Sequence, residues 1–358
     1  MLRTDRTDAA ASTAGRKADH LRINREEDVS AKGVTNGFDA WRFEHCALPE
    51  IDLDLVDTRC FLFEKQLEAP LLISCMTGGT DEGGEINRRL ARIAQRLRLA
   101  MGIGSGRVVL ERPEVLRTFD VRAEAPDIPL LANIGAVQLN KGYGAEECRR
   151  LVRMLGADAL VLHLNPIQEA VQIEGDTCFA GLLEKITALC EALEVPVIVK
   201  EVGWGIAPDV VQQLLSAGVS AVDVAGAGGT SWSEVEKHRL HDPWRRHVAE
   251  AFAGWGIPTA SCIERARMIA PDALLFASGG IRNGVDVAKA IALGADVVGI
   301  AGAFLRAAAR GKAAAEEFAH EVLATLRVAM FAIGAANLRQ LRRTTRLQFV
   351  GAVAERTP

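Results

Sequence analysis

A cluster of side chains able to do acid–base or metal chemistry stands at residues 163–169, which read His-Leu-Asn-Pro-Ile-Gln-Glu. It follows an apolar run, residues 157–162, that is short enough to be a strand buried on both faces. Pro166 should end this strand, so an imidazole, two amides and a carboxylate gather at its end. Burying such groups without partners is costly. The cluster therefore indicates a reaction site and not a piece of the core.

Lys200 is a second candidate, because it ends the apolar run at residues 195–199. A lysine in this position can form a Schiff base with a carbonyl substrate, or it can be a fixed cation beside an electron-rich ring. An ion pair with Glu201 or Asp223 is the structural alternative. The spacing of the residues does not separate the first two chemistries.

Two glycine-rich segments, residues 278–284 and 299–303, indicate a phosphate site. Glycines let backbone N–H groups approach phosphate oxygens, and the N-terminus of a following helix favours negative charge. The alternative is that these glycines only turn the chain. The segment 102–106 lacks the GxGxxG spacing, and no Walker sequence occurs, so neither a Rossmann dinucleotide site nor a nucleotide triphosphatase is indicated.

The elements that must position these residues alternate between short apolar runs and amphipathic segments. Helical patterns cover residues 85–94 and 207–215, for example, and strands are predicted at residues 71–76, 101–104, 128–134, 158–164, 195–200, 219–225, 273–278 and 296–301. Eight such units predict a single (β/α)8 TIM barrel, with an open doubly wound sheet as the alternative. Polar residues follow the strand ends, and only in a barrel would all of them meet on one rim.

The composition limits the remaining function classes. The chain has 358 residues, a net charge of −4 and 49% hydrophobic residues, and its basic residues are spread along it, so no nucleic-acid partner is predicted. Seven cysteines without a CxxC pair indicate neither a disulfide framework nor a zinc cluster, which fits a reducing cytoplasm. No apolar run approaches the roughly 20 residues that span a bilayer, so no membrane partner is predicted.

The predicted organisation has four parts. Residues 1–15 are a disordered leader, 16–70 form a flexible N-terminal arm and pre-barrel segment, 71–337 form the barrel, and 338–358 form a basic tail. The arginines of the tail should lie on a solvated helix or pair with acidic neighbours. The segment 229–258 would cover the barrel mouth, although its tryptophans at 232, 244 and 255 could equally be packing or subunit contacts.

Six motifs in order resemble type 2 isopentenyl diphosphate isomerases. They lie at residues 16–20, 76–79, 104–107, 163–169, 199–203 and 227–232, and the resemblance runs from about Arg16 to about Asn337. It implies a flavin mononucleotide (FMN) barrel that interconverts isopentenyl and dimethylallyl diphosphate. Reduced flavin would be the acid and base, NADPH or NADH the reductant, and Mg²⁺ the divalent cation that helps to bind diphosphate. The resemblance also implies a homotetramer or octamer.

The same resemblance assigns roles to individual residues. The flavin would contact Cys75, Met76, Thr77, Gly78, Ser105, Asn133, Lys200 and Thr230, with its phosphate on Gly279, Gly280, Ala301 and Gly302. Substrate would contact Arg16, Lys17, Ser105, Gly106, Arg107, His163 and Gln168. The catalytic group would be His163, Asn165, Gln168 and Lys200. Glu169 would ligate magnesium, and Gln168, being neutral, would position or relay rather than supply acid alone.

Several other functions fit parts of this pattern. FMN-dependent 2-hydroxy acid oxidases place a histidine base in the turn after the sixth strand, and residues 224–229 contain none. Dehydrogenases of inosine monophosphate need a cysteine near that loop, and Cys262 lies too far along the chain. A non-catalytic flavin or phosphate-binding barrel leaves the 163–169 cluster without a role, and a Schiff-base aldolase does not account for residues 76–79. One departure from the family pattern is Glu64, where a glycine is expected.

Overall fold

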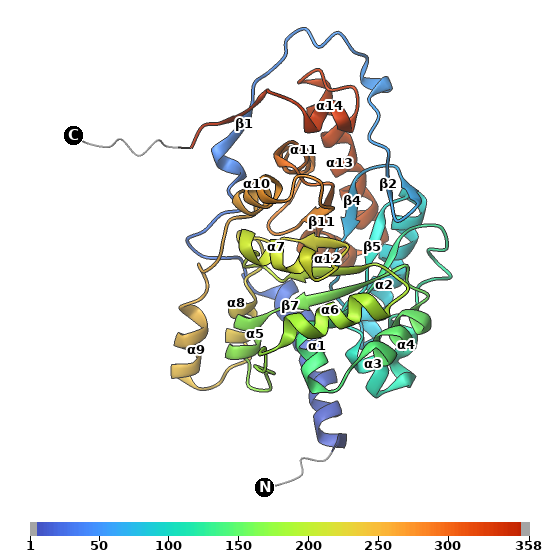
Figure 1. Cartoon of the computed structure of the whole chain (residues 1–358), viewed down its shortest axis with the longest axis vertical. Coiled ribbons are helices and arrows are strands. Elements are labelled where there is room, and N and C mark those ends of the chain that lie inside the picture. Colours follow the sequence, from blue (N-terminus) through green and yellow to red (C-terminus); the bar gives the residue numbers. More distant parts are fainter. Residues whose placement is uncertain (1–5, 352–358) are drawn as a thin grey trace, which may run out of the picture.

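A closed barrel of eight parallel strands forms the centre of the computed structural model, which describes residues 6–351 and their side chains from residue 15 onward (Figure 1). The barrel strands are β4 (Leu71–Ile73), β5 (Ala100–Gly102), β6 (Leu130–Gly135), β7 (Ala159–Leu164), β8 (Val197–Glu201), β9 (Ala221–Asp223), β10 (Leu275–Ala277) and β11 (Val297–Ile300). Each pairs in parallel with the next, and β11 closes the ring against β4. All eight predicted strands are present, and closure excludes the open sheet.

Helices surround the barrel and join its strands. They are α2 (Asp81–Leu97), α3 (Arg107–Glu111), α4 (Ala145–Leu155), α5 (Pro166–Val171), α6 (Leu182–Ala192), α7 (Pro208–Ser216), α8 (Trp232–Lys237), α9 (Pro243–Glu250), α10 (Thr259–Ile269), α11 (Gly284–Leu293), α12 (Gly302–Arg310) and α13 (Lys312–Phe331). Short 3-10 turns lie at Phe38–Ala40, Leu53–Leu55, Pro113–Thr118 and Ala136–Lys141. Both predicted helical patterns are confirmed by α2 and α7, which start at a Thr80 cap and at Pro208.

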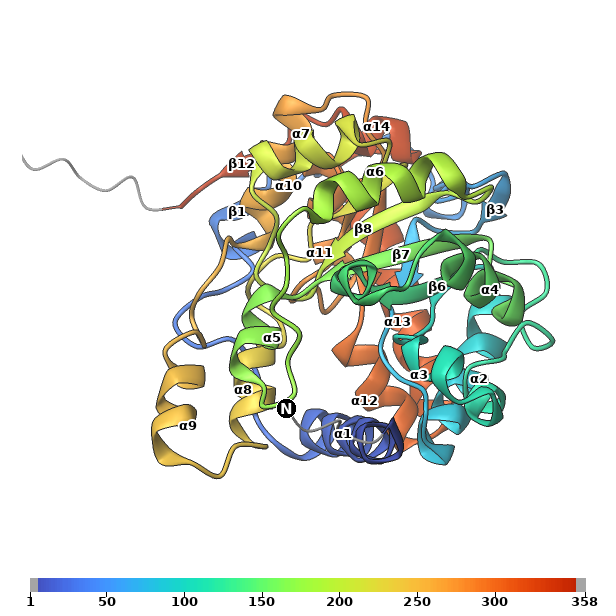
Figure 2. The same ribbon diagram turned by 60° about the horizontal axis from the view of Figure 1, so that its bottom comes forward.

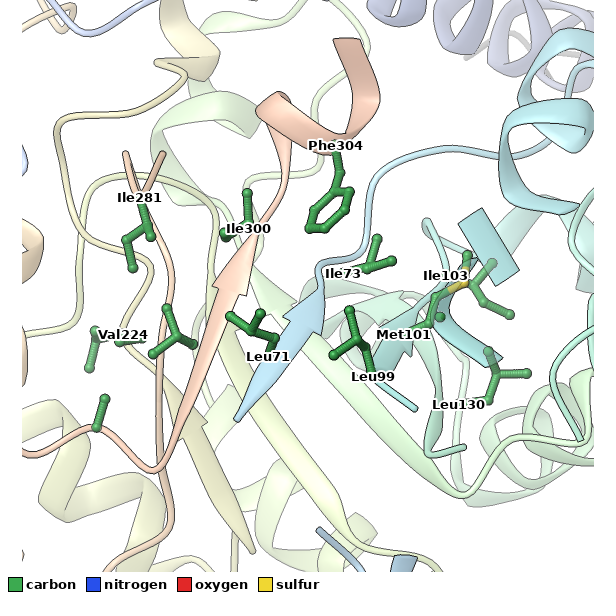
Figure 3. Close-up of a cluster of buried hydrophobic side chains, with 14 of the residues drawn as sticks. Leu71, Ile73, Leu99, Met101, Ile103, Leu130, Val224, Ile281, Ile300 and Phe304 are labelled. Carbon is green, nitrogen blue, oxygen red and sulfur yellow. The ribbon is translucent and has the colours of Figure 1, made fainter. Parts of the chain in front are cut away.

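The core has an outer layer between strands and helices and an inner layer inside the barrel. In the outer layer Leu71, Met101 and Leu130 pack with residues such as Phe304 from the covering helices (Figure 3). The inner layer takes at least one side chain from every barrel strand: Leu72, Ala100, Leu131, Ala159, Val161, Ile198, Ala221, Phe276 and Val297. The barrel interior is therefore filled near its N-terminal end, and polar groups are left to the opposite rim.

A hairpin of β2 (Cys60–Leu62) and β3 (Lys65–Leu67) closes the N-terminal end of the barrel. Its Leu62 and Leu67 are buried in the inner core layer. The two-residue turn consists of Phe63 and Glu64, whose φ angles are 47° and 65°. Left-handed backbone at both positions is what a tight hairpin requires and what glycine adopts most easily. The turn thus has the backbone conformation expected of a glycine, although its second residue is Glu64.

The same structural unit occurs twice in the barrel. Residues 122–135 and 267–280 share the pattern Arg-x-x-Ala-Pro-Asp-x-x-Leu-x-Ala-x-x-Gly, and each is followed by Leu-Gly-Ala-Asp before the next strand, at 155–158 and 293–296. Arg122 binds Asp158 at 2.7 Å, and Arg267 binds Asp296 at 2.7 Å. Each aspartate also accepts the backbone N–H of the previous strand, at 2.8 Å and 2.9 Å. The two units lie four strands apart, on opposite sides of the closed barrel.

The two guanidinium groups also bind equivalent carbonyl oxygens. Arg122 donates to the carbonyls of Ala125, Pro126, Ile128 and Gly156, and Arg267 donates to those of Ala270, Pro271, Ala273 and Gly294. Each arginine thus fixes the loop that enters one strand to the turn before the following strand. The arginine clusters of the repeat lie at the N-terminal ends of the strands, away from the polar rim.

The chain ends are packed on the barrel. Helix α1 (Arg6–Glu26) lies across the polar end, between α8 on one side and α3 and α12 on the other (Figure 2). Near the other terminus, α14 (Leu338–Arg342) is followed by β12 (Leu347–Phe349), which pairs with β1 (Trp41–Phe43). Arg342 binds Asp296 at 2.7 Å, so part of the predicted basic tail pairs with an acidic neighbour. Disorder of the leader stays a prediction; residues 1–5, like 352–358, lie outside the described residues.

Across residues 6–351, none of the helices combines the length and the apolar character that crossing a membrane requires.

Candidate active site

A cavity of about 510 Å³ opens at the C-terminal ends of the barrel strands, beneath α1. Its wall includes these predicted site residues: Arg16, Lys17, Cys75, Met76, Thr77, Gly78, Ser105, Arg107, Asn133, His163, Asn165, Gln168, Glu169, Lys200, Thr230, Gly279, Gly280, Ala301 and Gly302. Gly106 is the one predicted residue that does not line it. Residues from every barrel unit and from the N-terminal arm therefore meet around one space.

One end of the cavity carries a cluster of positive charge. The Nζ of Lys17 donates to the Ser105 carbonyl at 2.8 Å and lies 4.8 Å from the centre of the Phe119 ring. Enclosure in the cavity wall, followed by repulsion from Arg16 and Arg107, lowers the pKa of Lys17 to about 7. Enclosure and Arg107 also lower the pKa of Arg16. Cations held this close destabilise one another, so this end is suited to a multiply charged anion.

Arg107 links this positive end to acidic residues of the neighbouring loops. It binds Glu111 at 3.0 Å and Asp176 at 3.2 Å. Asp176 also binds Lys141 at 2.8 Å and accepts a hydrogen bond from Gln138. Arg107 is therefore held in place by two carboxylates.

The opposite end is a glycine cradle formed by the loops after β10 and β11. Gly279 and Gly280 have φ angles of 107° and 70°. A Cβ on Gly279 would lie 2.1 Å from the Gly226 carbonyl oxygen, and one on Gly280 would lie 2.5 Å from that of Gly228. These glycines are thus required by close packing of two loops, in addition to any role toward a ligand.

Two arginines that were not among the predicted site residues complete this end. Arg282 and Arg306 line the cavity beside the N-termini of α11 and α12. Burial, followed by Arg282, lowers the pKa of Arg306. Among the side chains described, neither arginine forms an ion pair. Backbone N–H groups, two helix N-termini and two guanidinium groups form a donor set that fits a phosphate monoester such as that of FMN.

Between the two ends, β7, β8 and β9 present a row of polar side chains. His163 is the register partner of Lys200, and its Nδ1 lies 2.9 Å from the Oδ1 of Asn133. Enclosure, with Lys200 as the next cause, lowers the pKa of His163 to about 3, so the imidazole is neutral. A neutral imidazole bonded through Nδ1 leaves Nε2 free to contact a ligand.

Lys200 is positioned by three oxygens. Its Nζ donates to the Glu201 carbonyl at 2.8 Å and to Ser278 Oγ at 3.4 Å, and it lies 3.6 Å from Asp223 Oδ2. The Glu201 carboxylate turns away and accepts three backbone N–H groups, from residues 202–204. Of the two ion pairs considered for Lys200, the structure therefore contains the one with Asp223.

Glu236 on α8 is a buried acid that sequence reasoning missed. Its Oε1 accepts from Gln168 at 3.0 Å and lies 2.8 Å from His20 Nε2. Burial opposes its ionisation, but hydrogen bonds from His20 and Gln168 and the charge of Arg239 lower its pKa to about 2. The carboxylate thus holds the Gln168 amide in place. Nothing in the sequence marked Glu236 as a buried residue, because it lies in a helix rich in charged residues.

Trp232 closes the same side of the cavity, packing edge-on against His20 with ring centres 5.1 Å apart. The other two tryptophans of the 229–258 segment, Trp244 and Trp255, are exposed by 62% and 60% and do not line the cavity. The segment covers the mouth through α8, whereas α9 lies farther out (Figure 2).

Glu169 is held by its own helix and the loop that follows. Its oxygens accept from the Asn165 amide at 2.8 Å, from Gln172 at 2.7 Å and from the Asp176 backbone at 2.6 Å. The Oδ1 of Asn165 is buried and has no hydrogen-bond partner. No group of three or more His, Cys, Asp or Glu side chains arranged for a metal occurs among the described residues. A carboxylate and a spare amide oxygen nevertheless fit Mg²⁺ when a ligand supplies the other oxygens.

Comparison with known proteins gives close relatives over nearly the whole chain. The profile of the FMN-dependent dehydrogenase family matches residues 156–348. An isopentenyl-diphosphate delta-isomerase from Nostoc sp. is 53% identical over 342 residues, 96% of this chain and 98% of the relative. One from Stutzerimonas stutzeri is 50% identical over 338 residues, 94% of this chain and 98% of the relative.

The similar solved structures are more distant. A putative lactate oxidase from Pediococcus acidilactici has a TM-score of 0.65 at 14% identity, covering 96% of this chain and 94% of that chain. An active mutant of (S)-mandelate dehydrogenase has a TM-score of 0.65 at 16% identity, covering 96% of this chain and 99% of that chain. At this level of identity the likeness supports the barrel fold alone.

Proposed function

This chain belongs to the isopentenyl-diphosphate delta-isomerase family, and from that membership we propose that it interconverts isopentenyl and dimethylallyl diphosphate with bound FMN. The observation that carries the proposal is the cavity itself. It has an anion-binding end at Arg16, Lys17 and Arg107, and a separate phosphate cradle at the loops after β10 and β11. Two phosphate-bearing ligands, a substrate and a cofactor, account for both ends.

The substrate end binds and orients the diphosphate. Arg16, Lys17 and Arg107 neutralise its charge, and the neutral His163, whose Nδ1–H is donated to Asn133, offers Nε2 as a hydrogen-bond acceptor. Glu169, with the spare oxygen of Asn165, would hold a magnesium ion, which would supply positive charge to the diphosphate. These contacts fix the head of the substrate, so the alkene is presented at a defined place in the cavity.

The alkene lies beside Gln168, whose amide is fixed by Glu236 and by Asn165. A neutral amide held from both sides orients the reacting carbons and does not ionise. His20 of α1 and Trp232 pack against each other in the wall of the cavity, and such a cover limits the access of water.

The cofactor end holds FMN through Gly279, Gly280, Ala301 and Gly302, assisted by Arg282 and Arg306. Bound in its reduced form, FMN supplies the proton donor and acceptor for moving the double bond. Lys200, on the cavity wall, would be the cation next to the ring, and Met76, Thr77, Gly78, Ser105, Asn133 and Thr230, which line the same cavity, would form the rest of its surroundings.

We also propose how the flavin is reduced, where the enzyme works and how its subunits assemble. NADPH or NADH provides the electrons for the initial reduction, with no net redox change in the substrate. None of the seven cysteines is in a disulfide, which supports a reducing, cytoplasmic location. We also propose a homotetramer or octamer, as the family resemblance implies.

The proposal is tested by isotope incorporation. Anaerobic, FMN-loaded and reduced protein is incubated with isopentenyl diphosphate and Mg²⁺ in deuterated water. Deuterium-labelled dimethylallyl diphosphate is the expected product, because the added proton comes from an exchangeable site. Recovery of unchanged, unlabelled substrate under these conditions would refute the isomerase assignment.

Two substitutions separate the roles inside the cluster. Gln168→Ala should lower kcat by about 10²-fold or more, as expected when a group that orients the reacting atoms is lost. Glu169→Ala should mainly raise KM and be partly rescued by high Mg²⁺. The matched control is Gln172→Ala, which removes a neighbour of Glu169 but no proposed ligand. Equal magnesium rescue of all three variants would contradict the metal role of Glu169.

A further inference from the structure

Asp223 is a buried carboxylate directly behind Lys200, at the end of β9. It is only 1% exposed and does not line the cavity, whereas Lys200 and Ser278 do. Ser278 Oγ donates to both of its oxygens, at 2.8 Å and 3.0 Å, and the Lys200 ammonium lies 3.6 Å away. A ligand in the cavity therefore meets the lysine first and the aspartate behind it.

The other titratable groups next to Lys200 are neutral or, in the case of Glu201, are less easily ionised because of burial and are bonded elsewhere. Enclosure keeps the pKa of His163 at about 3, and burial raises the pKa of the Cys75 thiol to about 11. Burial raises the pKa of Glu201 to about 7, and its carboxyl group turns away from Lys200 to accept three backbone N–H groups. Asp223 is thus the counter-charge of Lys200 within the barrel.

We propose that Asp223 sets the strength of the positive field that Lys200 exerts on a flavin in this cavity. Resting on the proposed function, this inference makes Asp223 a positioning residue that acts through Lys200 and never touches the cofactor. A lysine without a counter-charge would stabilise a reduced, anionic ring strongly. The buried aspartate offsets part of that attraction and lowers the reduction potential of bound FMN.

Asp223 also has a structural contact, which the test must separate from its charge. Its Oδ1 accepts the backbone N–H of Ala225 at 3.2 Å, and Ala225 has a φ of 39°. Asparagine has the same shape and retains an acceptor oxygen, so Asp223→Asn removes the charge with the least disturbance of this turn.

The experiment measures the midpoint potential of FMN bound to the full-length protein, by anaerobic dithionite titration against a reference dye. For Asp223→Asn we expect at least a tenfold shift of the equilibrium toward reduced flavin, which is about 30 mV upward for a two-electron couple. The control is Asp158→Asn, which removes a carboxylate at the opposite end of β7 and should leave the potential unchanged. A merely structural role of Asp223 would alter FMN affinity without this shift.

The comparison is repeated in a Lys200→Met background. The double variant has no buried charge at these two positions, and a neutral buried pair is better tolerated than a lone charge. There, without the lysine through which Asp223 acts, adding Asp223→Asn should shift the potential by much less than it does in the wild-type protein. A potential that stays the same or falls in Asp223→Asn, or that rises equally in both backgrounds, overturns the role of Asp223, even if the wild-type protein binds FMN and isomerises its substrate. Wild-type protein that binds no FMN would overturn the proposed function as well.

Discussion

At the scale of single residues, all of the site residues predicted from the sequence except Gly106 line the cavity. Polar residues that directly follow buried strands could be predicted to meet, because parallel strands of a barrel end on one rim. His20, Glu236, Arg282 and Arg306 were missed. They lie on helices or in a loop among other charged residues, and only tertiary packing decides which of those charges faces the cavity.

Lys17 gives a prediction about pH at this scale. Its pKa of about 7 means that the free protein has a charged Lys17 below pH 7 and a neutral one above. Diphosphate binds the charged form better, so affinity should fall as the pH rises through 7, by up to about tenfold per unit. Arginine remains charged throughout. The ratio of pyrophosphate Kd values, wild type over Lys17→Arg, should therefore increase between pH 6 and pH 9.

Calorimetric titration with pyrophosphate measures both values, and the ratio cancels the ionisation of the ligand itself. A ratio that does not change with pH would show that Lys17 does not titrate in this range.

At the scale of elements, the eight strands and the helices α2 and α7 followed from hydrophobic periodicity and capping residues. The pairing of β1 with β12 could not be predicted from these patterns. These strands have three residues each and are separated by the whole barrel, so no local pattern marks them as partners. The course of α1 across the cavity likewise depends on contacts with α3, α8 and α12.

The β2–β3 hairpin gives a prediction for an element. Glu64 is exposed and left-handed, with a φ of 65°. Glu64→Gly should stabilise the protein by about 0.5–1 kcal/mol, because glycine adopts this backbone without a steric cost. Glu68→Gly is the matched control: that glutamate is exposed and has no positive φ, so the change should destabilise by about 0.5–1 kcal/mol. Urea unfolding measures both, and a loss of stability in Glu64→Gly would contradict the argument.

At the scale of the whole molecule, the barrel class could be predicted from eight alternating units, but closure could not. Closure depends on β11 pairing with β4, more than 220 residues apart in the chain. The contacts that hold the barrel together at its N-terminal end also join distant parts of the chain. Each of the two arginine clusters joins a loop to a turn about 30 residues later.

The arginine clusters predict how stability is distributed. Arg122→Ala and Arg267→Ala each remove an ion pair and several carbonyl contacts, and each should cost about 2–3 kcal/mol. The clusters share no partners and lie on opposite sides of the barrel, so the double variant should equal the sum within about 0.5 kcal/mol. Urea unfolding of the three variants measures this. A double variant that loses much less than the sum would mean that the clusters act as one unit.

The repetition of the arginine unit also bears on ancestry. Two sets of matching donors and acceptors, set four strands apart in one closed ring, are the trace expected from duplication and fusion of a four-stranded half-barrel. Under that descent Asn133 corresponds to Ser278, and Gly135 to Gly280. The loops around the histidine cluster and the glycine cradle would then be divergent copies of one ancestral rim.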